Sequence, residues 1–218
     1  MKKTISRKHI NALLDLLEDQ GIYIRAMQDS LFLRLLLIRK PNLAAVSFLG
    51  NIHINDNCPL STNSLFATIL HEAIHAKDRK KNPLKYFFSY FSPQIYITIA
   101  AILLGLGAMF LPALFLVSLT LFAVLGLPWI SKGRFYLEER GHTANLAVEY
   151  WTTSKISDKH IKDIARKMSS KTYWFMMTYS YSLSKMRARA EQIKTAETYK
   201  KYHWIPILKE AQQLIGER

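Results

Sequence analysis

The sequence predicts a mainly α-helical α+β fold, in which an apolar helical hairpin, expected to be transmembrane, is inserted into a core of a short sheet and several helices. Three observations support this prediction. Apolar residues recur at helical spacing towards both ends of the chain, one short segment alternates as a strand does, and residues 86–131 contain no Asp, Glu, Lys or Arg. The 218 residues are enough for one ordinary domain, or a small domain with an appendage.

The chain divides into three parts. Residues 1–85 contain N-terminal helices, short strands and a helix with a His-Glu-x-x-His motif. Residues 86–131 form the apolar hairpin, and residues 132–218 contain a helix with a candidate metal ligand, followed by two or three basic helices.

Helix and strand signals alternate before the motif. Residues 6–19 carry a helical stripe of apolar side chains, and residues 29–38 are a second helix candidate. Residues 44–55 are expected to be extended and to include a short, half-buried strand. A loop follows, and Asn63 or Thr62 is expected to cap the next helix.

The most informative feature is the motif HEAIH at residues 71–75. Positions i and i+4 of a helix lie one turn apart on the same face, so His71 and His75 can bind one metal ion. Glu72 then points to the side where a metal-bound water would lie. This is the pattern of zinc peptidases, and the uncharged residues around it suit a helix that is buried on its other faces.

A catalytic zinc ion has three protein ligands and an open position for water, so the motif needs a third ligand. The best candidates follow the hairpin. Adjacent carboxylates on a helix diverge by about 100°, so only one of Glu138 and Glu139 can face the metal. We favour Glu138, because Gly141 beside it lets two helices approach closely, whereas Glu139 next to Arg140 is expected to be solvated. Glu139 and His142 remain the alternatives as ligand.

These residues predict hydrolysis by a metal-activated water. Zinc lowers the pKa of its bound water to near neutrality, and Glu72 would take the proton as general base and later pass it to the leaving amine. His142 lies on the same helix face as Glu138 and would orient that ligand or stabilise an oxyanion. The candidate oxyanion donors are Arg134, His142, Tyr150 and Tyr173.

The apolar hairpin predicts membrane insertion. At about 1.5 Å per residue, residues 94–110 and 113–130 are each long enough to cross most or all of a hydrocarbon core roughly 30 Å thick. We therefore expect two membrane spans; the alternative is a hairpin buried within a soluble domain. Basic residues flank both ends of the hairpin, so the positive-inside rule places the protein in the cytoplasmic (inner) membrane with both termini in the cytoplasm.

The chain combines a net charge of +14 with 50% apolar residues. Much of the positive charge lies in the last third, where it could bind anionic lipid headgroups or nucleic acid. Lipid headgroups are the nearer partner beside a membrane hairpin, and the sequence contains no nucleic-acid-binding motif. The single cysteine, Cys58, excludes an intramolecular disulfide and suits a reducing compartment.

Residues 45–150 resemble small gluzincin-like HExxH metallopeptidases of bacteria and phages. The resemblance rests on HEAIH and on the segment from Arg134 to His142. In that family a basic residue precedes a Glu-x-x-Ala-Tyr helix that provides the third zinc ligand, which corresponds to Glu138. The resemblance implies a minimal zincin-like core of HExxH helix, short sheet and Glu-bearing helix, with a peptide lying along the sheet edge. Here Gly141-His142 replaces Ala-Tyr, and the apolar insert is longer than in many relatives.

The sequence therefore predicts a membrane-associated zinc peptidase that acts on a peptide or protein substrate on the cytoplasmic side. The alternative is a non-enzymatic membrane protein, holin-like or membrane-remodelling, in which HEAIH is coincidental or inactive. The two hypotheses differ in whether the purified protein holds a metal ion.

Overall fold

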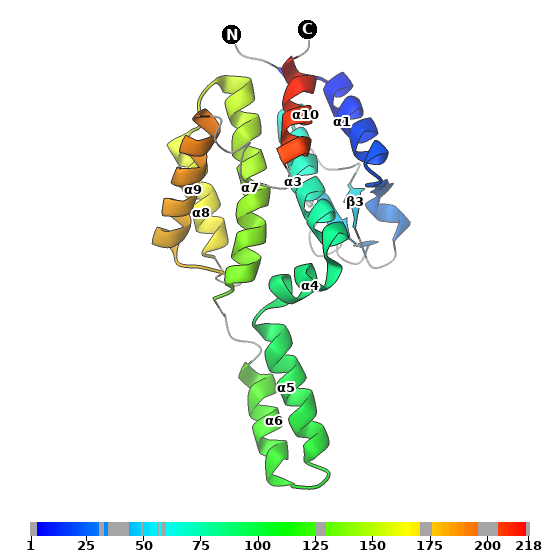
Figure 1. The fold of residues 1–218 in the computed structure, drawn as a ribbon, viewed down its shortest axis with the longest axis vertical. Coiled ribbons are helices and arrows are strands. Elements are labelled where there is room, and N and C mark those ends of the chain that lie inside the picture. Colours follow the sequence, from blue (N-terminus) through cyan, green and yellow to red (C-terminus); the bar gives the residue numbers. More distant parts are fainter. Residues whose placement is uncertain are drawn as a thin grey trace.

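The structure of the protein is a computed structural model. It is mainly helical with one three-stranded sheet, which confirms the predicted mainly α-helical α+β class. Figure 1 shows a body of helices and strands from which two helices project together. The structure describes residues 4–30, 33–34, 44–48, 50–55, 57, 60–124, 130–170, 176–195 and 205–216.

The first helix, α1 (Arg7–Asp19), confirms the helical stripe expected over residues 6–19. Its buried side chains lie three and four positions apart: Ile10, Leu13 and Leu17. The chain then forms strand β1 (Ile24–Ala26) and a short 3-10 helix, η1 (Met27–Asp29). Most of the helix expected over residues 29–38 lies outside the described residues.

Strands β2 (Ala45–Phe48) and β3 (Asn51–Ile54) complete the sheet, whose order is β1-β3-β2. The central strand β3 pairs in parallel with β1 and antiparallel with β2, so β2 is an edge strand among the strands that the structure describes. Gly50 turns the chain between β2 and β3 with a φ of +80°, a conformation that strains other residues. The extended segment expected over residues 44–55 is therefore a pair of strands.

Helix α3 (Thr62–Lys81) carries the HEAIH motif. Its cap is Ser61, whose Oγ accepts a backbone N–H from the first turn at 3.3 Å. The expected cap at Thr62 or Asn63 is therefore wrong by one or two positions. The Asn63 side chain instead accepts the N–H of Ile5, 3.2 Å away, and so ties the N-terminal segment to α3.

The charge-free stretch begins within one helix and continues through two more: α4 (Pro83–Phe91), α5 (Gln94–Gly107) and α6 (Ala113–Val124). Helices α5 and α6 pack against each other and project from the body (Figure 1). Among the described residues no single helix is long and apolar enough to cross a membrane; α4 and α5 pass that test only together, with a bend of 87° between them. Residues 125–129 of the expected second span lie outside the described residues.

The rest of the body is built around one long helix, α7 (Lys132–Thr153), which packs beside α3 (Figure 1). Helices α8 (Asp158–Met168) and α9 (Tyr179–Lys194) pack on each other and on α7. The last helix, α10 (Ile205–Gly216), contacts α1 and α7. Pro206 lies in the first turn of α10, where proline is tolerated.

A buried ion pair joins α3 to α7. The Nη2 atom of Arg140 lies 2.8 Å from Oδ1 of Asp78, and both side chains are almost completely shielded from solvent. Burying two charges is favourable only when they remain paired. The pair therefore helps to hold the two helices in one register.

The ion pair predicts the stability of an Asp78 variant. Asp78→Ala removes this carboxylate from the buried guanidinium of Arg140, so the free energy of unfolding should fall by about 3–5 kcal/mol in a denaturant titration. The matched control is Asp163→Ala, which breaks the exposed pair between Asp163 and Arg166 and should cost no more than about 1 kcal/mol. Equal losses in the two variants would show that the buried pair has no special role.

Candidate metal centre

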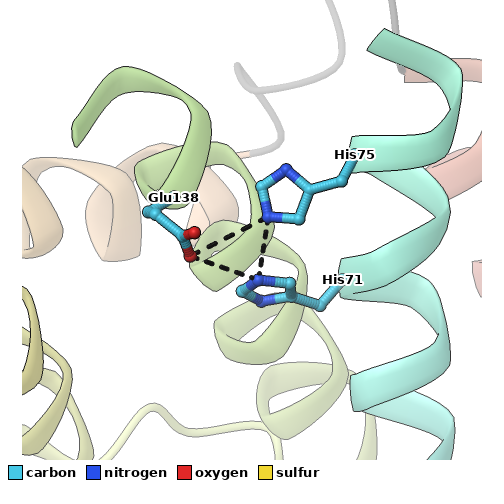
Figure 2. A group of neighbouring side chains, drawn as sticks. All are labelled: His71, His75 and Glu138. Carbon is cyan, nitrogen blue, oxygen red and sulfur yellow. Dashed lines mark hydrogen bonds and ion pairs between the residues drawn. The ribbon is translucent and has the colours of Figure 1, made fainter. Parts of the chain in front are cut away.

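Helices α3 and α7 bring together three side chains that could hold a metal ion. His71 and His75 lie one turn apart on α3, and Glu138 faces them from α7 (Figure 2). The two Nε2 atoms are 3.1 Å apart. The Oε2 atom of Glu138 lies 3.5 Å from Nε2 of His71 and 3.8 Å from Nε2 of His75. All three side chains are buried.

These distances suit a single metal ion. Bonds of about 2.0–2.1 Å to a tetrahedral ion place neighbouring ligand atoms about 3.3 Å apart. The separations of 3.1, 3.5 and 3.8 Å lie close to that value. His71, His75 and Glu138 could therefore hold one ion with little movement, and we call these three side chains the metal group.

The charge state of the group also suits a cation. Burial works to raise the pKa of Glu138, but hydrogen bonds and charge interactions with His71 and His75 outweigh it and hold the pKa well below its usual range. Burial works to lower the pKa of His75, yet the hydrogen bond to Glu138 and the charges of Glu138 and Glu72 raise it. An ionised carboxylate thus faces two imidazoles in a buried site.

Glu72 lies between the metal group and the sheet. Its Oε2 atom accepts the backbone N–H of Ser47 at 2.6 Å. Ser47 belongs to the edge strand β2, so this N–H points away from β3 and towards α3. The general-base candidate is thus held at the open edge of the sheet, next in sequence to the first ligand, His71.

The two ligand-bearing helices approach closely at Gly141. A Cβ atom added there would lie 2.6 Å from both Cε1 and Nε2 of His71, closer than atoms can pack. Gly141 stands three residues after Glu138 and so lies on the same side of α7. The close approach expected at Gly141 is therefore present, and it places the imidazole of His71 against the α7 backbone.

His142 packs beside the metal group. Its ring contacts the ring of His71 edge to face, with 4.9 Å between the centroids, but neither of its nitrogens belongs to the group of atoms that could hold the ion. Burial, and then the charge of His71, set the pKa of His142 well below its usual value, so the ring is neutral at neutral pH.

Asn145 links the two rings from the next turn of α7. Its Nδ2 atom lies 3.5 Å from Nδ1 of His71 and 3.3 Å from Nδ1 of His142. A histidine that binds metal through Nε2 carries a proton on Nδ1 and needs an acceptor there. A half-turn of the Asn145 amide would present its oxygen to that proton. Sequence reasoning missed Asn145; its place seven residues, or two turns, after Glu138 is the signal that could have found it.

Helix α4 covers the other side of the metal group with two tyrosines. The Tyr90 hydroxyl lies 3.4 Å from Oε1 of Glu138, the carboxylate oxygen turned away from the histidines. The Tyr86 ring contacts His75 and stacks on Tyr90. Burial raises the pKa of the Tyr90 hydroxyl, so it stays protonated and able to donate. Neither residue was predicted, although their spacing of four places them on one helix face.

The remaining candidates have other contacts. The Oε1 atom of Glu139 lies 2.9 Å from Nε of Arg189, and both side chains are shielded, so the expectation of a solvated Glu139 is wrong. Arg134 donates from Nε to the carbonyl of Tyr90 at 2.8 Å. Tyr150 packs against the hydrophobic core, and Tyr173 lies outside the described residues.

No family model, curated protein or solved structure matches this chain. The function is therefore inferred from the geometry and chemistry of the site itself.

The contact at Gly141 predicts the effect of a single methyl group. Gly141→Ala should displace the ring of His71 from its position opposite Glu138. The metal affinity should therefore fall by at least about tenfold, as measured by competition with a chelating dye. In an open helix position the same change stabilises by about 0.5–1 kcal/mol, because alanine restricts the unfolded chain. A variant that gains stability and binds zinc normally would contradict the close approach of the helices.

The contact of Asn145 with His71 predicts a role in metal affinity. Asn145→Ala should weaken metal binding by about 10–100-fold, because it removes the amide that could turn its oxygen to the Nδ1 proton of His71. The control is Glu149→Gln, one turn further along α7, where the carboxylate contacts His160 instead. Isothermal titration of both metal-free variants would check this, and unchanged affinity in Asn145→Ala would exclude the positioning role.

Proposed function

We propose that this protein is a metal-dependent peptide hydrolase that uses a zinc ion and works at a membrane surface. The observation that carries the proposal is the buried convergence of His71, His75 and Glu138 from two helices, with Glu72 directed at the edge of a sheet. A chance HExxH match would not be expected to meet a third, ionised ligand at tetrahedral spacing.

The donor set supports zinc as the metal. Two imidazole nitrogens and one carboxylate oxygen form the ligand set of several zinc hydrolases, which leave a fourth position open. When bound, such an ion polarises a carbonyl and lowers the pKa of water. Other divalent ions accept the same donors, so the metal itself has to be measured.

Glu72 is the general base of the proposed reaction. Its carboxylate would accept a proton from the attacking water and later deliver that proton to the nitrogen of the leaving amine. The two transfers balance, because the peptide C–N bond breaks as a C–O bond forms and the products are an acid and an amine. The hydrogen bond from Ser47 keeps the Glu72 carboxylate turned towards the strand edge before substrate arrives.

The edge strand β2 supports a polypeptide as substrate. An extended peptide can pair with an open strand edge through main-chain hydrogen bonds, which gives affinity without requiring a particular sequence. The N–H of Ser47 on this edge donates to Glu72, so the general base lies at the edge itself. A peptide on this edge would therefore run past Glu72 and the metal group.

Two side chains are suited to stabilise charge on the carbonyl oxygen during attack. His142 is our sequence-based candidate and lies in ring contact with His71. Tyr90 adds a protonated hydroxyl close to the metal group. Arg134 lies behind Tyr90, with its guanidinium over the tyrosine ring, so its proposed part is to hold Tyr90 in place.

The exposed apolar surface of α5 and α6 supports attachment to a membrane. Large side chains that would favour a hydrocarbon environment cover both helices. With the basic flanks, this supports the cytoplasmic face of the inner membrane and anionic lipids as the setting. The same surface is what favours the alternative function, a membrane-active protein without catalysis.

Metal content and two variants test the proposal together. The purified protein should hold about one zinc ion per chain by elemental analysis and should release peptides from an unstructured protein substrate. His71→Ala should lose the zinc. Glu72→Gln should keep it and lose hydrolysis by about 10²–10⁴-fold, because only the base is removed.

The control for this experiment is His160→Ala, which removes a histidine paired with Glu149 on the surface and should change neither quantity. A wild-type protein that binds no zinc would exclude the peptidase and favour the non-enzymatic membrane protein. Zinc binding with equal hydrolysis in Glu72→Gln would retain the metal site but remove Glu72 as base.

A further inference from the structure

The helices α4, α5 and α6 carry an apolar surface that the described part of the body does not cover. The turn between α5 and α6 is the most exposed part, with Met109 and Phe110 exposed by 81% and 91%. On the flanks of the two helices Leu103, Phe115 and Leu116 are also exposed. Exposed apolar area of this extent marks an interaction site.

The hydroxyl groups of Thr98, Ser118 and Thr120 form their hydrogen bonds within the hairpin. Thr98 donates its hydroxyl to the carbonyl of Gln94, and Thr120 donates to the carbonyl of Leu116. Ser118 donates across the hairpin to the carbonyl of Ala101 at 2.8 Å. Hydrocarbon accepts only segments whose hydrogen bonds are made internally, so this pattern favours lipid chains as the occupant of the surface.

The hairpin is too short to reach through a bilayer from its base. Helix α5 has 14 residues, which at 1.5 Å per residue is about 21 Å, against a hydrocarbon core of about 30 Å. Its turn, residues 108–112, contains no polar side chain. A turn that emerged on the far side would meet water and headgroups, whereas an apolar turn suits the hydrocarbon interior.

Helix α4 lies across the base of the hairpin with a bend of 87° between the two axes. Its outer face exposes Leu84, Phe87 and Phe91, three and four positions apart, as in helices that lie in the plane of a lipid interface. Its inner face carries Tyr86 and Tyr90 against the metal group. One helix therefore connects the apolar surface to the site.

Basic residues surround the base of the hairpin. Lys81 and Lys85 are exposed at the junction of α3 and α4, and Lys132 is exposed at the start of α7, where the chain returns from the hairpin. Lys81, Asn82 and Lys85 line a hollow of about 360 Å³ at this junction. Cations at this level complement the anionic headgroups of one leaflet.

We propose that α4, α5 and α6 form a monotopic anchor: α4 lies in the plane of the headgroups of a leaflet with anionic lipids, and the α5–α6 hairpin enters the hydrocarbon and ends within it. Both ends of the hairpin then emerge on the same side. This placement sharpens the membrane attachment included in the proposed function and rests on it. The metal group lies one helix thickness from the lipid, so the substrates would be polypeptide segments close to the membrane surface.

The depth of single labels in a bilayer tests this geometry. The natural cysteine is removed by Cys58→Ser, and single cysteines are placed by Met109→Cys at the turn, Leu84→Cys on the outer face of α4, and Lys159→Cys on α8 as control. Each full-length variant is labelled with an environment-sensitive fluorophore and reconstituted into vesicles of phosphatidylethanolamine and phosphatidylglycerol. Quenchers are placed in mid-chain lipids, in headgroup lipids, and as iodide inside or outside the vesicles.

The anchor predicts three distinct patterns. The label at Met109 should be quenched several-fold more by mid-chain lipids than by iodide on either side, the label at Leu84 mainly by headgroup lipids, and the control at Lys159 only by external iodide. Quenching of the Met109 label by internal iodide would overturn the proposal in favour of a spanning hairpin. Quenching of that label by external iodide would show that the hairpin lies outside the bilayer and would contradict the membrane attachment itself. Zinc content and hydrolysis are measured separately and test the proposed peptidase, so a failure of that proposal can be told apart from a failure of the anchor.

Discussion

The contact between α3 and α7 is the constraint on which the rest of the site depends. The imidazole of His71 packs directly on the α7 backbone at Gly141, where a Cβ atom would clash. At that separation Glu138 can reach both histidines with one carboxylate oxygen. A larger residue at 141 would separate the helices by more than the tolerance of a metal site, because ligand atoms must lie within a few tenths of an ångström of their positions.

Burying charge on α7 fixes its rotation about its own axis. Glu138, Glu139 and Arg140 follow one another in sequence and are all buried, yet each has its own partner: His71 and His75, Arg189 on α9, and Asp78 on α3. Any rotation of α7 would break several of these pairs at once, and each broken pair leaves a buried charge that costs several kcal/mol, about 3–5 in measured cases. Ion pairs that add little net stability can in this way specify a single arrangement of helices.

Local patterns in the sequence predicted the metal group, whereas most of its surroundings depend on contacts distant in sequence. His71 and His75 were predictable because helix geometry fixes a spacing of four, and Gly141 beside Glu138 indicated a close helix contact. The environment of Glu139 was misjudged because its partner, Arg189, lies 50 residues further along the chain. Tyr86 and Tyr90 were missed because hydropathy shows where charge is absent but not where a helix ends. The chain bends by 87° between α4 and α5, so α4 stays beside the body, and its tyrosines face the metal group.

Helix α4 belongs both to the surroundings of the metal group and to the proposed membrane anchor. A movement of the anchor would therefore reach the site. In the proposed anchor one face of α4 lies on lipid and the other on the metal group, so α4 could not move relative to the membrane without moving Tyr90 against Glu138. The guanidinium of Arg134, which contacts both the carbonyl and the ring of Tyr90, carries the same displacement into the first turn of α7. Lipid contact would then favour one position of α4 over others, and differential affinity of that kind is the only way in which a bilayer can bias a site it does not touch. The proposed anchor, inserted between the second and third candidate ligands in sequence, would therefore be more than a tether, since the chain cannot join His75 to Glu138 except through it.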